Sequence, residues 1–73
     1  MKWAYGVFSL GNRWAICTRL TDAKLQLREF GGGYIRRLPR TLYDDGGSWD
    51  APTFTVLSDK IATGQGGRIY WEI

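Results

Sequence analysis

Histidine is absent from this chain of 73 residues and cysteine occurs once, as Cys17, so several kinds of site are excluded. A structural zinc site needs about four Cys or His ligands. A single thiol forms no internal disulfide, and it fits a reducing compartment. Without histidine the most common proton shuttle of enzymes is missing, and Cys17 has no base with which to form a nucleophile pair. The sequence therefore predicts a protein with no enzymatic activity, metal or cofactor.

Long hydrophobic runs are also missing. The apolar stretch at 3–10 is interrupted by Gly6 and Ser9, and no run approaches the ~18 residues that a membrane span requires. No small-residue cleavage site follows this stretch, as a signal peptide would require. We therefore expect a soluble, cytoplasmic protein without a membrane partner. Its length allows a single domain, residues 1–73.

Charge is plentiful but unevenly distributed along the chain. Residues 13–40 contain seven Lys or Arg and two acids, a net charge of +5, in a chain whose total is +3. Residues 41–59 contain four aspartates and no Lys or Arg, a net charge of −4. A basic surface attracts phosphates, whereas an acidic one repels them or contacts a basic partner. The sequence thus predicts a surface with two regions of opposite sign.

Short segments rich in aromatic and β-branched residues are separated by glycines, a pattern typical of β-strands. We predict strands at 2–10, 13–20, 24–30, 34–38, 53–57 and 68–73, with an irregular segment at 40–52 and one helical turn at 58–63. Gly11 and Asn12 suit a tight hairpin turn. For 22–30 a helix is the alternative, because Ala, Lys, Leu and Gln favour helices. The alternation of Leu25 and Leu27 with polar residues favours the strand.

This pattern predicts a mainly-β fold: a small antiparallel sheet of five or six short strands, curled into an SH3-like or OB-like barrel. A sheet packed on one short helix is the alternative. The resemblance to these barrels is one of architecture and identifies no family.

Arginine dominates the basic region, and arginine is well suited to bidentate contacts with phosphate and to stacking. If 13–20 and 24–30 are paired strands, their outward side chains lie ~5 Å apart and form one patch. A tyrosine nearby supplies a ring on which a nucleobase can stack. The predicted basic face comprises Arg13, Arg19, Lys24, Arg28, Tyr34, Arg36, Arg37 and Arg40. A solvated sheet face with no ligand is the alternative interpretation.

The acidic segment contains a second candidate site, a partner-binding loop made of Asp44, Asp45, Trp49 and Asp50. The spacing of its aspartates does not match the alternating ligands of a calcium-binding EF-hand loop. Its tryptophan either folds back on the core or projects as an anchor at an interface, where Trp is a frequent hot spot.

Two hypotheses for the function follow. The first is a protein-interaction module, such as the small regulators and inhibitors that phages and mobile elements encode, which binds a protein partner or a second copy of itself. The alternative is a β domain that binds DNA or RNA by contacting phosphates through the basic face. An enzyme and a sugar-binding domain are less favoured than either.

Overall fold

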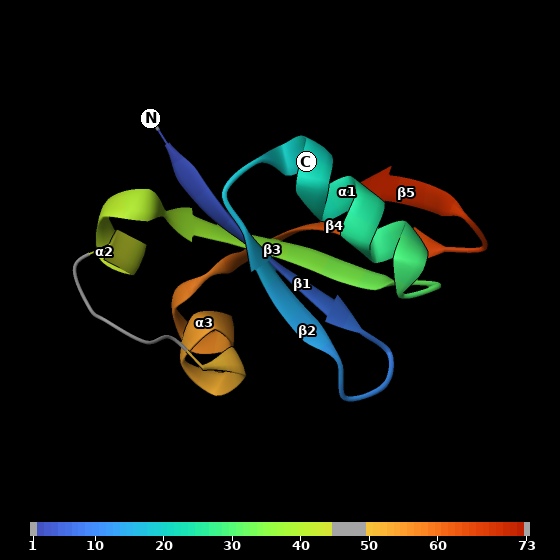
Figure 1. Ribbon diagram of the computed structural model, residues 1–73, viewed down its shortest axis with the longest axis horizontal. Coiled ribbons are helices and arrows are strands. Elements are labelled where there is room, and N and C mark those ends of the chain that lie inside the picture. Colours follow the sequence, from blue (N-terminus) through green and yellow to red (C-terminus); the bar gives the residue numbers. More distant parts are fainter. Residues whose placement is uncertain (1, 45–49, 73) are drawn as a thin grey trace.

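The computed structural model describes residues 2–44 and 50–72 and shows a mainly-β protein with one antiparallel sheet (Figure 1). Its five strands are β1 (Trp3–Ser9), β2 (Trp14–Cys17), β3 (Gly33–Pro39), β4 (Asp59–Gln65) and β5 (Arg68–Trp71). The helices are α1 (Leu20–Glu29), α2 (Arg40–Asp44) and α3 (Ala51–Leu57). The strands lie in the order β2-β1-β3-β4-β5, so β1 and β3 occupy the interior of the sheet.

The sheet is open, and the predicted barrel is not confirmed. Strands β2 and β5 are its two edges, with no pairing between them in the described chain. Figure 1 shows α1 on one side of the sheet and α3 on the other. A sheet can bury its apolar faces against helices or against itself. Because helices cover both faces here, the arrangement is closest to the alternative of a sheet packed on a helix.

The predicted strand at 24–30 is wrong, since this segment belongs to helix α1. Ala23 and Leu27, four residues apart, lie on one face of the helix and are both buried. Leu25, which the strand pattern placed inward, is 56% exposed. The helix carries the chain across β1, from β2 to β3, and ends at Glu29. Gly31, two residues later, has a φ of 77°, which only glycine readily adopts.

The predictions for 53–63 are also wrong, because the helix and the strand are exchanged. Residues 53–57 lie in α3, whose start is capped by the carboxylate of Asp50; this side chain accepts a hydrogen bond of 2.8 Å from the backbone N–H of Thr53. Phe54 anchors α3 on the sheet and is fully buried. This packing overrides the β propensity of Thr and Val. Residues 59–65 form β4, and α2 lies within the segment predicted to be irregular.

Two hydrophobic clusters, one on each face of the sheet, make up the core. The cluster under α1 contains Val7, Ala23, Leu27, Ile35 and Ala62, and the cluster under α3 contains Ala4, Phe8, Leu38 and Phe54. Both draw on alternate residues of β1 and β3, whose side chains point to opposite faces. Each helix covers only part of its face of the sheet, and polar and aromatic side chains occupy the rest.

Candidate functional site

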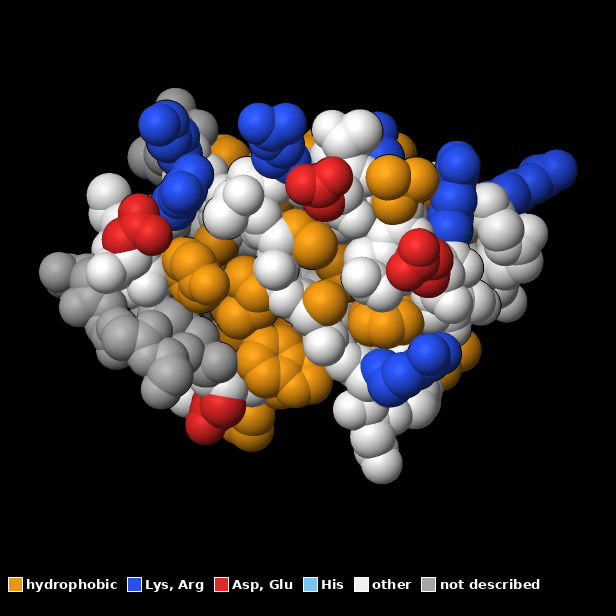
Figure 2. All heavy atoms as spheres, viewed as in Figure 1, with side chains coloured by type: hydrophobic (Ala, Val, Ile, Leu, Met, Phe, Trp, Pro, Cys, Tyr) orange, Lys and Arg blue, Asp and Glu red, His pale blue; other side chains and the backbone are white. Residues whose placement is uncertain are grey.

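Basic side chains gather on the side of the sheet that carries α1. Eight of the ten Lys and Arg residues lie on α1, on the strands beside it or in the grooves along it: Lys2, Arg13, Arg19, Lys24, Arg28, Arg37, Arg40 and Arg68. We call this set the α1 basic face. Figure 2 shows basic side chains along the upper margin of the molecule, the side on which α1 lies in Figure 1. Four acids lie among them: Asp22 and Glu29 on α1, Asp44 beside Arg40, and Asp59, which pairs with Arg37 in the β3–β4 register.

The first of two grooves on this face lies at the N-terminal end of α1. Its volume is about 500 Å³, and we call it the N-terminal groove. It is lined by Lys2, Trp3, Tyr5, Thr18, Arg19, Leu20 and Arg40. The backbone N–H of Arg40 donates a hydrogen bond of 3.0 Å to the carbonyl of Lys2, which holds the start of β1 against the start of α2. Residues from both ends of the 2–40 segment thus meet at one groove.

Arginines beside this groove have donors that the described chain does not use. The Nε atoms of Arg37 and Arg40 are buried and have no hydrogen-bond acceptor among the described residues. Arg40 Nε lies 3.5 Å from the exposed carboxylate of Asp44, which is an ion pair but is longer than a normal hydrogen bond. The guanidinium of Arg37 lies 4.0 Å from the ring centre of Trp3. These cations are therefore only weakly neutralised by internal partners.

The second groove, the β5 groove, has a volume of about 460 Å³ and runs between α1 and β5. Lys24, Arg28 and Arg68 line it together with Ile69, Tyr70 and Trp71. Lys24 Nζ lies 5.1 Å from the ring centre of Trp71, a cation–π contact. This second groove therefore repeats the combination of cations and aromatic rings found in the first.

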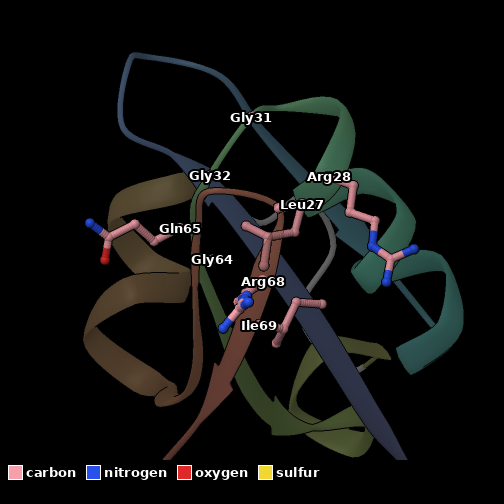
Figure 3. Close-up of a pocket in the computed structure, with 9 residues that line it drawn as sticks. Leu27, Arg28, Gly31, Gly32, Gly64, Gln65, Arg68 and Ile69 are labelled. Atoms are coloured by element: carbon pink, nitrogen blue, oxygen red, sulfur yellow. The ribbon is translucent and has the colours of Figure 1, made fainter.

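A small apolar pocket of about 80 Å³ adjoins the β5 groove (Figure 3). Leu27 points into it toward Ile69, whereas the side chains of Arg28 and Gln65 point away from it. Gly64 leaves room for Leu27, because a Cβ atom there would lie 2.8 Å from the leucine side chain. The pocket is thus a gap in the packing of α1 on the sheet, and it leaves the guanidinium of Arg28 at the surface.

The predicted basic face is divided by the sheet. Arg13, Arg19, Lys24, Arg28, Arg37 and Arg40 lie on the α1 side, where a helix, not the predicted pair of strands, brings them together. Arg13 lies 5.0 Å from the ring centre of Phe30, at the end of α1. Arg36 and Tyr34 belong to the opposite face, on which α3 packs.

On that opposite face both residues contact their own protein. Arg36 donates from Nε to Ser58 Oγ at 2.9 Å, and a terminal nitrogen of its guanidinium donates to the Ser58 carbonyl. The ring of Tyr34 stacks on Phe8 with 5.3 Å between the ring centres. The geometry therefore gives Arg36 a structural role and removes Tyr34 from the neighbourhood of the α1 basic face.

Within the predicted acidic loop, Asp45 and Trp49 lie outside the described residues. Asp44 pairs with Arg40, and Asp50 caps α3. The hydrogen bond from Thr53 lowers the pKa of the Asp50 carboxyl. Both described acids thus make local contacts within the fold.

The thiol of Cys17 lies at the edge strand β2. Burial, and to a smaller extent the charge of Asp22, raise the pKa of Cys17. A raised pKa disfavours the thiolate, which is the nucleophilic form. Among residues 2–44 and 50–72, no three His, Cys, Asp or Glu side chains gather in a way that could hold a metal ion.

Several residues of the two grooves were not predicted as site residues: Lys2, Trp3, Tyr5, Arg68, Tyr70 and Trp71. They lie near the chain ends, far in sequence from the arginine-rich segment. Strand pairing brings them to α1. The available hint in the sequence was that a cation stands close to a tryptophan twice, Lys2 beside Trp3 and Arg68 near Trp71.

Comparison of the chain with protein-family models, with curated proteins and with solved structures finds no match. None of the helices in the described part of the chain is long and apolar enough to cross a membrane.

Proposed function

We propose that this protein binds nucleic acid through the α1 basic face. The observation that carries the proposal is the convergence of eight of the ten Lys and Arg residues on one side of the sheet, along two grooves that also contain aromatic rings. Cations at such a surface replace the counterions of phosphates, which favours binding of a polyanion. Aromatic rings beside them offer stacking surfaces for bases.

The expected strength of the salt dependence follows from the charges of this face. Eight cations and four acids leave a net charge of about +4, so we expect about four phosphates to be neutralised. For a single strand this corresponds to a slope of about −2.8 in log K against log salt. Raising the salt from about 50 to about 200 mM should then weaken binding roughly fiftyfold.

The experiment is fluorescence anisotropy with labelled DNA and RNA oligonucleotides at these two salt concentrations. Arg28→Glu changes an exposed cation on the α1 basic face, and Lys60→Glu makes the same charge change at an exposed position outside it. Lys60 pairs with Glu72 at 3.3 Å, an exposed contact that contributes little to stability. We expect Arg28→Glu to weaken binding about tenfold or more and Lys60→Glu to change it less than about twofold.

Equal losses in the two variants would show that net charge alone, and not the α1 basic face, attracts the oligonucleotide. Absence of binding at about 50 mM salt would contradict the proposal altogether, because phosphate contacts are strongest at low salt.

A protein-interaction module remains the second candidate, and a specific observation favours it. On α3, Val56 is 81% exposed and Leu57 is 53% exposed, so the outer side of this helix is apolar. Strand β2 also offers a free edge to a second chain. A regulator or inhibitor of this type would bind its partner without oligonucleotide, and Val56→Asp should then abolish capture of the partner while leaving nucleic-acid binding unchanged.

A further inference from the structure

We infer that the strand bound by the α1 basic face is single-stranded, and that the N-terminal groove holds one unstacked base together with its phosphate. This inference rests on the proposed function and specifies its ligand. It follows from two features: the charges on the outer ridge of α1, and the aromatic rings in the groove.

The outer ridge of α1 is unsuited to insertion into a duplex. Asp22, Leu25 and Glu29 are three and four residues apart and therefore lie on one exposed ridge of the helix. A helix that enters the major groove passes between two lines of phosphates. Two carboxylates and a leucine on this ridge would meet these phosphates with charge repulsion, which the single arginine beside Leu25, Arg28, offsets only in part. The other cation of α1, Lys24, lies on the flank of the helix beside Trp71.

The N-terminal groove has the size and the lining for a nucleotide. Its volume of about 500 Å³ lies within the range of small-ligand pockets, about 300–1,000 Å³. Trp3 and Tyr5 supply aromatic surface, and Lys2, Arg19 and Arg40 supply charge around it. A base can reach these rings only when it is unpaired, because a duplex keeps its bases stacked inside. Stacking on aromatic side chains beside a basic groove is the usual mode of single-strand binding.

Arg37 supports this arrangement from the neighbouring strand. Its guanidinium lies 4.0 Å from the ring centre of Trp3, and its backbone pairs with Tyr5 in the β1–β3 register. The ring that would receive the base is therefore positioned by a cation, which also adds to the positive potential at the groove.

The test compares single-stranded and duplex oligonucleotides of the same sequence, as DNA and as RNA, for the wild type and two matched variants. Trp3→Leu removes the ring from the N-terminal groove. Trp14→Leu makes the same substitution on the opposite face, where Trp14 stacks on Phe8. Trp3→Phe keeps an aromatic ring and serves as the rescue. Urea unfolding of each variant establishes that the compared proteins are folded.

We expect the wild type to bind a single strand at least about tenfold more tightly than the duplex. Trp3→Leu should lose about 5- to 150-fold in single-strand affinity, the fold-change that corresponds to one stacked base. Trp3→Phe should recover most of this loss, and Trp14→Leu should change the affinity less than about twofold.

Salt-dependent binding that is equal for duplex and single strand, with no effect of Trp3→Leu, would overturn this inference but leave the proposed function intact. Absence of binding to every oligonucleotide would overturn both. If Trp3→Leu fails to fold, the wild-type preference still decides whether the bound strand is single or double, and the affinity of Trp3→Phe relative to Trp14→Leu tests the groove.

Discussion

Arg36 and Arg37 are neighbours in sequence, yet the structure predicts opposite consequences for their replacement by methionine. Arg36 donates two hydrogen bonds to Ser58, one to the hydroxyl and one to the carbonyl. Ser58 is only 6% exposed, so Arg36→Met would leave its buried hydroxyl and carbonyl without this partner. Arg37 lies over the ring of Trp3 on the other face of the sheet.

The magnitudes follow from these contacts. A hydrogen bond from a charged group contributes about 1.5–3 kcal/mol, and a buried polar group left unpaired costs a similar amount. Because Arg36 is itself partly exposed, we expect Arg36→Met to lower the free energy of unfolding by about 2–3 kcal/mol, which is less than the roughly 3–6 kcal/mol that two such bonds would sum to. For a domain of this size the loss corresponds to a decrease in Tm of roughly 8–24 °C. Arg37→Met loses a cation–π contact, worth about 0.5–1 kcal/mol at a partly exposed site.

The assay is urea unfolding monitored by tryptophan fluorescence, combined with anisotropy titrations of labelled single-stranded DNA. Arg36→Met should destabilise the protein more than Arg37→Met does, while oligonucleotide affinity should fall for Arg37→Met and remain unchanged for Arg36→Met. A loss of stability below about 0.5 kcal/mol for Arg36→Met would refute the structural role of its bonds to Ser58. A larger loss of affinity for Arg36→Met than for Arg37→Met would refute the assignment of the two residues to different faces.

Three further predictions concern the fold. Gly33→Ala should destabilise the protein by more than about 3 kcal/mol in urea unfolding, because φ is 137° there and a Cβ atom would overlap a carbonyl of β1, whereas Gly66→Ala, with φ of 60° and open space, should cost about 1 kcal/mol. The pKa of Asp50 is lower in the folded than in the unfolded protein, so its contribution to stability is present above pH ~4 and lost as the pH falls through the lowered pKa; Asp50→Asn should remove this part of the acid sensitivity in unfolding measured from pH 7 to 2. Leu27→Ala should lower the free energy of unfolding by about 2–5 kcal/mol, and adding Gly64→Ala should cost less in that background than in the wild type, because the methyl group would occupy the vacated space.

The sequence predicts strands well where alternation and turn residues agree. The strands predicted at 2–10, 13–20, 34–38 and 68–73 overlap β1, β2, β3 and β5. For β1 and β2, the turn residues Gly11 and Asn12 agree with the alternation of inward and outward side chains in predicting a hairpin. These elements form because local preference and burial favour the same conformation.

Prediction failed where two periods fit the same residues. In 24–30 the leucines alternate with polar residues, but Ala23 and Leu27 also fit one face of a helix. Only packing on the sheet decided between them. In 53–57 the β-branched residues favour a strand, yet the Asp50 cap and the burial of Phe54 stabilise a helix. The packing of Phe54 depends on a sheet built from distant segments, so the local sequence does not reveal it.

In the candidate site, too, the sequence gives the types of residue, whereas the fold decides which of them lie together. The abundance of arginine at 13–40 is visible in the sequence, but the predicted basic face wrongly grouped Arg36 with Arg37, although neighbouring residues of a strand point to opposite faces. Their different partners, Ser58 and the ring of Trp3, come from distant segments that only folding brings close.

The order of amino acids alone establishes an arginine-rich segment, the absence of histidine, and enough β-forming segments for a small antiparallel sheet. Tertiary structure decided that a helix spans β1 and that Lys2 and Arg68, from the two ends of the chain, join the arginines around it. Side-chain type is a local property, whereas the distance between two charges depends on strand order and on the face that each helix covers. For that reason the charges could be counted from the sequence, but the grooves between them could be located only in the folded chain.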